Sequence, residues 1–210
     1  MLASGILAIA AGYLLGSIPF AYILARAVKG MDIRQSGNVG TLSVMRDVGT
    51  APGFAVLALD MGKGSLSVAV AQWLGVPTIF VLLSGFAAVL GHCWPVYLRF
   101  QGGGAIAPTL GVFLVLTPRE FGISFAIMAV TVLLTSNVRF GAAVGLVFLP
   151  LFVWWFGGDI SYIVYSMALP LFLVLRNITK FKRELGTEHG RRNFVVDHDF
   201  TPWQTRGKRG

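Results

Sequence analysis

Apolar residues gather into seven runs along the chain, and short polar or glycine-rich connections separate them. The runs cover residues 2–24, 51–74, 76–98, 105–117, 121–136, 140–156 and 160–175. A helix that crosses about 30 Å of hydrocarbon needs about 20 residues, and this pattern therefore predicts an all-α integral membrane protein with about seven transmembrane helices. The fourth and fifth runs are short. They can be tilted, re-entrant or two halves of one broken helix, which leaves a five-span arrangement open.

Composition supports the same class of protein. Of the 210 residues, 55% are hydrophobic and only 12% are charged, and the mean hydropathy is +0.74. A soluble domain carries roughly a quarter of its residues charged. No Lys or Arg precedes the first apolar run, so we expect a first transmembrane helix there rather than a cleaved signal peptide.

Basic residues alternate between the connections, and this alternation predicts the orientation. They follow the first, third and fifth runs and crowd the C-terminal tail. The connections 72–77 and 157–159 carry no basic residue, and Arg119 after the fourth run stands beside Glu120. The positive-inside rule places the N-terminus outside and the C-terminus in the cytoplasm. We divide the chain into a transmembrane domain, 1–176, and a basic tail, 177–210, which we interpret as a short interfacial helix followed by a loose end. The net charge of +8 fits anionic lipid headgroups and topology better than nucleic acid.

The first predicted cytoplasmic connection is rich in hydrogen-bond donors. Segment 36–41 reads Ser-Gly-Asn-Val-Gly-Thr, and Arg46 follows it. Two glycines and an asparagine allow positive φ, so consecutive backbone N–H groups can turn inward and bind an anion. Ser36 and Thr41 add hydroxyls, and Arg46 adds a planar cation suited to phosphate. We interpret the segment as a phosphate site, with an ordinary Gly-Asn turn as the alternative.

Polar residues also occur within the second and third runs. Asp60 and Lys63 are three residues apart and share one helix face, so they form either a bracing ion pair or a pair directed towards a polar active site. His92, taken alone, fits a hydrogen-bonded core histidine. It precedes three consecutive glycines, 102–104, that lead into the fourth run, a geometry suited to an anion at a helix N-terminus. No metal-ligand spacing joins His92, His189 and His198, and we expect neither a metal nor another cofactor.

These motifs, in this order, resemble the PlsY family of bacterial glycerol-3-phosphate acyltransferases. Its first motif, Ser-Gly-Asn-x-Gly-Ala-Thr-Asn-x-x-Arg, is similar to residues 36–46, and its Leu-Asp-x-x-Lys-Gly element is similar to residues 59–64. Its Gly-His-x-x-Pro and Phe-x-Gly-Gly-Lys-Gly-Val-Ala-Thr motifs resemble residues 91–95 and 100–108. Its third motif, Asn-Ile-x-Arg-Leu with a later Gly-Thr-Glu, resembles residues 177–188.

The resemblance implies a seven-helix enzyme of the bacterial inner membrane whose active site faces the cytoplasm. It implies transfer of a fatty acyl group from acyl-phosphate to glycerol 3-phosphate, which yields lysophosphatidic acid for phospholipid synthesis. The implied catalytic residues are Ser36, Arg46, His92, Asn177 and Glu188. The implied substrate-binding residues are Gly37, Asn38, Gly40, Thr41, Lys63, Gly102, Gly103 and Gly104. The implied partners are the two substrates and membrane lipids.

The chain departs from the family pattern at several positions. Gly104 replaces the phosphate-binding lysine of the family, Leu42 and Ser43 replace its Thr and Asn, and no histidine precedes Asn177. A charge-assisted hydrogen bond contributes about 1.5–3 kcal/mol, so the missing lysine alone can weaken phosphate binding tenfold or more. The alternative function is therefore a catalytically weakened relative that binds a phosphorylated or acylated ligand and regulates or scaffolds lipid synthesis.

Overall fold

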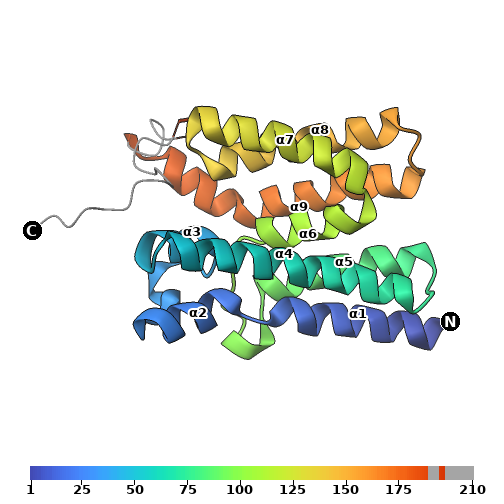
Figure 1. Cartoon of the computed structure of the whole chain (residues 1–210), viewed down its shortest axis with the longest axis horizontal. Coiled ribbons are helices and arrows are strands. Elements are labelled where there is room, and N and C mark those ends of the chain that lie inside the picture. The colour runs from blue at the N-terminus through green and yellow to red at the C-terminus, as the bar shows by residue number, and fades with distance from the viewer. Residues whose placement is uncertain (189–193, 197–210) are drawn as a thin grey trace, which may run out of the picture. The chain divides into compact units, whose positions relative to one another are not determined.

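The computed structural model describes residues 1–188 and 194–196 (Figure 1). The described chain is all-α, and each of the seven apolar runs contains a helix. Within the described residues, six helical segments are long and apolar enough to cross a membrane, and the first of them, Leu2–Lys29, comprises two consecutive helices. A further apolar helix, Ile106–Leu116, is shorter. The prediction of an all-α integral membrane protein is confirmed. The chain divides into two compact units, Met1–Leu116 and Thr117–Gly210.

The first unit is built on three long helices that lie side by side (Figure 1). Its elements are α1 (Leu2–Ser17), α2 (Phe20–Lys29), the 3-10 turn η1 (Ile33–Ser36), α3 (Thr41–Asp47), α4 (Thr50–Trp73), α5 (Thr78–Cys93), the 3-10 turn η2 (Val96–Leu98) and α6 (Ile106–Leu116). Helix α1 packs against α4 and α5, and α6 packs against α4. Close contact depends on small residues, because a Cβ at Gly16 would collide with the backbone of Ala88 on α5.

The predicted helix over 2–24 is in fact two helices with a break at Ile18 and Pro19. Pro19 has no backbone N–H and adopts φ −93° and ψ 68°, which is not helical. Proline inside a helix removes one backbone hydrogen bond and clashes with the preceding turn. Apolar composition shows how much chain lies in the membrane, but it does not show that the helix is interrupted.

The second unit contains three long helices, α7 (Pro118–Thr135), α8 (Val138–Trp155) and α9 (Ile160–Leu185). Helix α7 packs against α8, and α8 packs against α9. Asn137 caps α8, because its side-chain oxygen accepts a hydrogen bond from the Phe140 N–H at 3.0 Å. Helix α9 continues to Leu185, so the first part of the basic tail extends a membrane helix and forms no separate interfacial helix. The structure does not describe residues 189–193 and 197–210. His189, His198 and the basic residues from 191 onward all lie in these two ranges.

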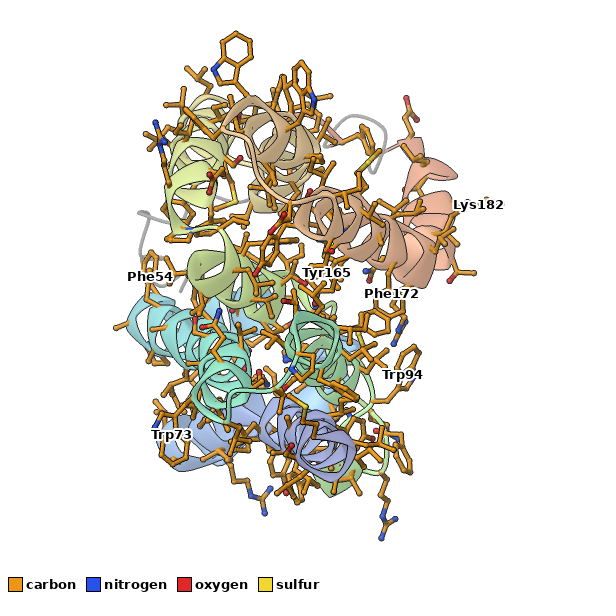
Figure 2. All side chains as sticks on the ribbon, turned by 90° about the vertical axis from the view of Figure 1, so that its right-hand side faces the viewer. Phe54, Trp73, Trp94, Tyr165, Phe172 and Lys182 are labelled. Carbon is orange, nitrogen blue, oxygen red and sulfur yellow. The ribbon has the colours of Figure 1, made fainter. Side chains whose placement is uncertain are left out.

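Large apolar side chains cover the outside of the helices. Trp73, Leu134 and Trp155 are 84%, 78% and 72% exposed, and Phe54 is 53% exposed. Figure 2 shows Phe54 and Trp73 pointing away from the helices that carry them. Such a surface is unfavourable in water but favourable against lipid tails, as expected for an integral membrane protein.

Candidate active site

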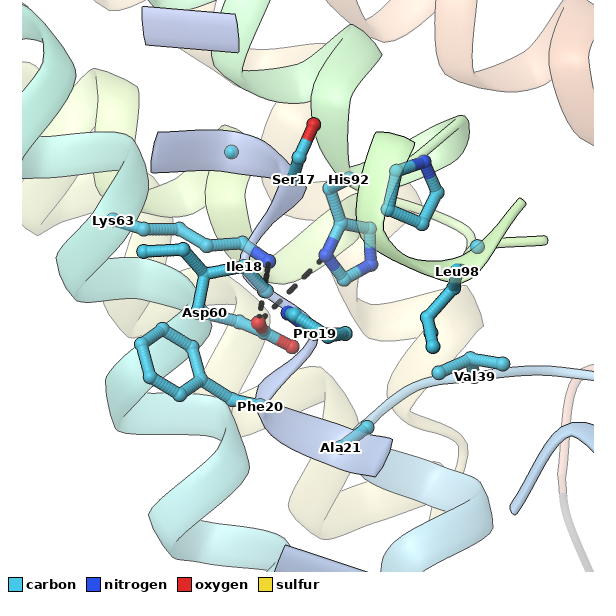
Figure 3. Close-up of a pocket in the computed structure, with 14 residues that line it drawn as sticks. Ser17, Ile18, Pro19, Phe20, Ala21, Val39, Asp60, Lys63, His92 and Leu98 are labelled. Atoms are coloured by element: carbon cyan, nitrogen blue, oxygen red, sulfur yellow. Dashed lines mark hydrogen bonds and ion pairs between the residues drawn. The ribbon is translucent and has the colours of Figure 1, made fainter. Parts of the chain in front are cut away.

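A cavity in the first unit collects side chains from segments far apart in the sequence (Figure 3). The cavity is small, with room for about one water molecule. The lining residues are Gly16, Ser17, Ile18, Pro19, Phe20, Ala21, Val39, Asp60, Lys63, His92, Pro95, Leu98, Gly102 and Gly103. The cavity therefore joins the α1–α2 break, the Ser-Gly-Asn segment, the polar face of α4, the end of α5 and the glycine segment before α6.

The Ser-Gly-Asn segment bends sharply between η1 and α3. Gly37 has φ 76°, a left-handed conformation that favours glycine, and this agrees with the turn expected from the sequence. Val39, in the middle of the segment, lines the cavity. The hydroxyl of Thr41 and the side-chain oxygen of Asn38 are buried and have no hydrogen-bond partner among the described residues. An unpaired buried hydroxyl is costly unless a ligand or water completes it.

Ser36 and Arg46 both bind the carboxylate of Asp47, a residue that none of the sequence motifs indicated as part of the site. The Ser36 hydroxyl donates to Asp47 Oδ2 at 2.6 Å, and the Arg46 guanidinium donates to both carboxylate oxygens at 2.8 and 3.0 Å. The hydrogen bonds from Arg46 lower the pKa of Asp47, and the one from Ser36 adds to this shift. Two donors expected to bind phosphate are therefore adjacent and already hold an anionic group.

Asp60 and Lys63 form a buried ion pair on α4. Lys63 Nζ lies 2.8 Å from Asp60 Oδ1, with side chains only 3% and 2% exposed. The same Nζ donates to the Ile18 carbonyl at 2.9 Å, across the break between α1 and α2. His92 Nδ1 lies 3.7 Å from Asp60 Oδ1 (Figure 3). The sequence leaves two interpretations open, a bracing ion pair and a pair directed towards a polar site. The structure fits both, because the pair braces the helices and also lines the cavity.

The glycine segment rests directly on His92. The Gly103 N–H donates to the His92 carbonyl at 3.1 Å. A Cβ at Gly103 would collide with the His92 ring and with the carbonyl oxygen of Val39, so glycine is required for close approach. Positive φ occurs instead at Arg99, Phe100 and Ala105, with values of 51°, 63° and 62°. These non-glycine residues flank the segment and hold it in a strained turn.

The structure thus brings together several of the residues selected from the sequence. Lys63, His92, Gly102 and Gly103 line one cavity. The first motif reaches this cavity only through Val39, which is not among the selected residues. The selected residues of the first unit that do not line it are Ser36, Gly37, Asn38, Gly40, Thr41, Arg46 and Gly104. Asn177 and Glu188 belong to the second unit: Asn177 lies on α9 and donates to the Leu173 carbonyl at 2.8 Å, and Glu188 is exposed just beyond the helix. Among the described residues, no group of three His, Cys, Asp or Glu side chains can hold a metal ion.

Sequence comparison assigns the family. The sequence model of the family described as "Glycerol-3-phosphate acyltransferase" matches residues 6–186. The chain is 37% identical over 196 residues to "Glycerol-3-phosphate acyltransferase 1" of Dehalococcoides mccartyi, covering 89% of this chain and 94% of that protein. It is 40% identical over 192 residues to "Glycerol-3-phosphate acyltransferase" of Synechococcus sp. CC9902, covering 90% and 96%.

Structural comparison agrees. The crystal structure of PlsY, an integral membrane glycerol 3-phosphate acyltransferase, in its glycerol 3-phosphate form matches with a TM-score of 0.79 and 30% identity, covering 87% of this chain and 92% of that one. Its lysophosphatidic acid form matches with a TM-score of 0.77 and 28% identity over the same shares. The fold is that of a membrane acyltransferase. The chain belongs to the glycerol-3-phosphate acyltransferase family, and the resemblance to PlsY is confirmed.

Proposed function

We propose that this protein transfers a fatty acyl group from acyl-phosphate to glycerol 3-phosphate and releases lysophosphatidic acid and inorganic phosphate. Membership of the family supports the acyltransferase activity and its place in phospholipid synthesis. The acyl-phosphate donor and the roles of individual residues are our proposal. The observation that carries the proposal is the close packing of Gly103 against Val39, which joins two donor-rich loops at one cavity.

The first loop supplies the acyl-phosphate site. Ser36 and Arg46 bind phosphate oxygens in place of the Asp47 carboxylate, and the buried Thr41 hydroxyl donates a further hydrogen bond. Backbone N–H groups of the segment 37–40 complete the cradle, with Gly37, Asn38 and Gly40 giving the backbone its sharp bend. A guanidinium that binds two oxygens at once fixes the orientation of the phosphate as well as its position.

The reaction requires no covalent enzyme intermediate. The glycerol hydroxyl oxygen attacks the acyl carbonyl carbon, the bond from that carbon to the phosphate oxygen breaks, and the hydroxyl proton moves to a phosphate oxygen. Acyl-phosphate is already activated, so positioning and charge stabilisation supply most of the acceleration. We assign the orientation of glycerol 3-phosphate to Asn177 and Glu188, and phosphate binding to Gly102, Gly103 and Gly104. His92 supports the glycine segment through the hydrogen bond that its carbonyl accepts from Gly103.

Gly104 leaves the glycine segment without the lysine of the family pattern. Lys63 lines the same cavity, but its ammonium group is engaged by Asp60 and by the Ile18 carbonyl. Arg46 therefore carries the larger part of the phosphate charge in our proposal. The family match across residues 6–186 favours an active enzyme over the weakened relative.

We also propose that the cavity faces the cytoplasm of a bacterial cell and that the protein resides in the inner membrane. The support is the distribution of basic residues: Arg26, Lys29, Arg34 and Arg46 all lie on the connection that carries the Ser-Gly-Asn segment. Anionic lipids of the cytoplasmic leaflet attract such a cluster by about 1 kcal/mol for each basic residue near the surface.

Purified protein in detergent, radiolabelled glycerol 3-phosphate and chemically synthesised palmitoyl-phosphate test the proposal. We expect labelled lysophosphatidic acid with palmitoyl-phosphate and little with palmitoyl-coenzyme A at the same concentration. Arg46→Ala should lower turnover about 10²–10³-fold, the loss typical of one donor that stabilises developing charge, and Ser36→Ala should also lower it. Equal product with the coenzyme A thioester would refute the donor, and a fully active Arg46→Ala variant would refute the first loop as the phosphate site.

A further inference from the structure

Asp60 contacts the two side chains that hold the cavity together. It forms the ion pair with Lys63 at 2.8 Å and faces His92 at 3.7 Å. Asp60 is 1% exposed, and its second oxygen, Oδ2, has no hydrogen-bond partner among the described residues. The carboxylate thus lines the inner wall of the cavity, where its neighbours are Lys63 and His92 (Figure 3).

Lys63 joins Asp60 to the break in the first apolar run. Its ammonium donates to the Ile18 carbonyl at 2.9 Å and lies 5.8 Å from the centre of the Phe20 ring. The same carbonyl also accepts a hydrogen bond from the Phe20 N–H at 3.2 Å, so the Lys63 ammonium is its second donor. Non-helical backbone at membrane depth is tolerated where neighbouring groups satisfy it in this way. Lys63 thus stabilises the non-helical backbone that forms one wall of the cavity.

His92 joins Asp60 to the glycine segment. The His92 carbonyl accepts the hydrogen bond from Gly103, and the Gly103 backbone touches both the His92 ring and the Val39 carbonyl. A movement of the His92 ring towards Asp60 or away from it would therefore move Gly103 and change its spacing from Val39. Asp60 Oδ1 is too far from His92 Nδ1, at 3.7 Å, for a hydrogen bond, so its influence on the ring is that of a neighbouring charge.

Fold stability alone does not explain the buried Asp60–Lys63 ion pair. Replacing a buried ion pair by apolar residues of similar volume is often neutral or stabilising. Charged residues within membrane spans are costly and usually serve a functional site. We propose that Asp60 is a positioning residue for acyl transfer, because it holds Lys63 and His92 in the places that fix the α1–α2 break and the glycine segment. This inference rests on the proposed role of that segment in phosphate binding.

The double variant Asp60→Leu/Lys63→Met separates positioning from bracing. It removes both charges and leaves neither one unpaired, so the protein should fold and its thermal midpoint should stay the same or rise. A displacement of about 1 Å at a reacting group can cost about a hundredfold in rate. We expect kcat/KM to fall between tenfold and a hundredfold, with the KM for glycerol 3-phosphate raised and the thermal shift produced by glycerol 3-phosphate lost.

Two further variants keep the test decisive if the double variant fails to fold. Lys63→Met leaves Asp60 able to take up a proton and become neutral, which avoids a buried unpaired charge. Lys63→Arg keeps a cation and donor next to Asp60 and Ile18. We expect the same loss in Lys63→Met and recovery of most of the activity in Lys63→Arg. Ser67→Ala is the matched control, because Ser67 lies one turn further along α4, is also buried, and donates to the α4 carbonyls of Lys63 and Gly64.

The glycerol 3-phosphate thermal shift separates this inference from the proposed donor. If the parent protein fails to use palmitoyl-phosphate, the donor assignment is wrong, and the loss of the shift in the folded Lys63→Met or double variant still supports positioning. If these variants keep both the parental KM and the parental shift, Asp60 only braces the helices and the inference is overturned. The inference is also overturned if Ser67→Ala reproduces their losses.

Discussion

The hydroxyl of Ser36 donates a hydrogen bond to the carboxylate of Asp47 at 2.6 Å, across eleven positions of the chain. The same carboxylate binds Arg46 through two further hydrogen bonds. An incoming phosphate needs these donors, so substrate and Asp47 compete for one set of hydrogen bonds. The first loop is therefore organised for an anion before the substrate arrives.

Asp47→Asn should lower the KM for acyl-phosphate by about threefold to tenfold, since a charge-assisted hydrogen bond to the competing carboxylate contributes about 1.5–3 kcal/mol and only part of it is released. Arg46 holds the pKa of Asp47 below its ordinary value, so the carboxylate is charged throughout the neutral range. The effect should therefore be the same at pH 6 and pH 8. Initial rates at varied palmitoyl-phosphate and fixed glycerol 3-phosphate measure it.

Asp32→Asn is the matched control for this change. Asp32 pairs with Arg34 rather than with Ser36 or Arg46, and the hydrogen bonds from Arg34 lower the pKa of Asp32 to about 2. The control removes the same charge from the same connection, so its KM should equal that of the parent. A raised KM in Asp47→Asn would mean that the carboxylate orients Arg46 rather than competing with substrate.

Gly103→Ala should fold but lose about tenfold to a hundredfold in kcat/KM. The added Cβ meets the His92 ring and the Val39 carbonyl, so the glycine segment must move away from the first loop. A shift of this kind lowers the reaction rate strongly, because the site must hold the reactants in position. Gly62→Ala on α4 is the control: nothing lies within 4 Å of a Cβ there, and the change should raise stability by about 0.4–1 kcal/mol without loss of activity. Parental kinetics in Gly103→Ala would show that the two loops need not touch.

The positions of the helices are predictable from the sequence because side chains that face lipid must be apolar. The apolar runs 51–74 and 140–156 predict helices, and the structure has Thr50–Trp73 and Val138–Trp155. The prediction from apolar content misses the break at Pro19, because it does not take the proline within the run into account. The extension of α9 to Leu185 escapes it because the last turns of that helix are polar and basic.

The site is predictable only in part. Ionisable residues in apolar surroundings indicate Lys63 and His92, because such residues are costly in a membrane. Three consecutive glycines before an apolar run indicate the glycine segment, because this geometry suits an anion at a helix N-terminus. Their meeting at one cavity depends on packing between α1, α4 and α5, which no local pattern encodes. The sequence does not indicate Asp47 for the same reason. Beside Arg46 it resembles an ordinary surface charge, and only the fold brings Ser36 to it.

Single cysteines in a Cys93→Ser background test the orientation. The positive-inside rule places Gln35, on the first connection, and Glu188, on the tail, in the cytoplasm. It places Gln72, in the last turn of α4, and Asp159, before α9, outside, and all four residues are exposed. An impermeant thiol reagent added to intact cells should label positions 72 and 159 and leave 35 and 188 unlabelled until the cells are broken. The reverse pattern would place the cavity on the outer face.

The glycine at position 104 offers the sharpest test of how this chain manages without the lysine of its family. If the cavity lacks a phosphate contact, Gly104→Lys should raise kcat/KM by about tenfold or more, because one charge-assisted hydrogen bond contributes about 1.5–3 kcal/mol and about 1.4 kcal/mol corresponds to a factor of ten. Gly104→Met has a side chain of similar length without the charge, so it measures the cost of added bulk alone. Radiolabelled glycerol 3-phosphate with palmitoyl-phosphate gives the rates for parent and both variants. A gain in the Lys variant that the Met variant lacks assigns the effect to charge. Equal losses in both variants, with a parent that turns over readily, would mean that Arg46 and the backbone donors already satisfy the phosphate.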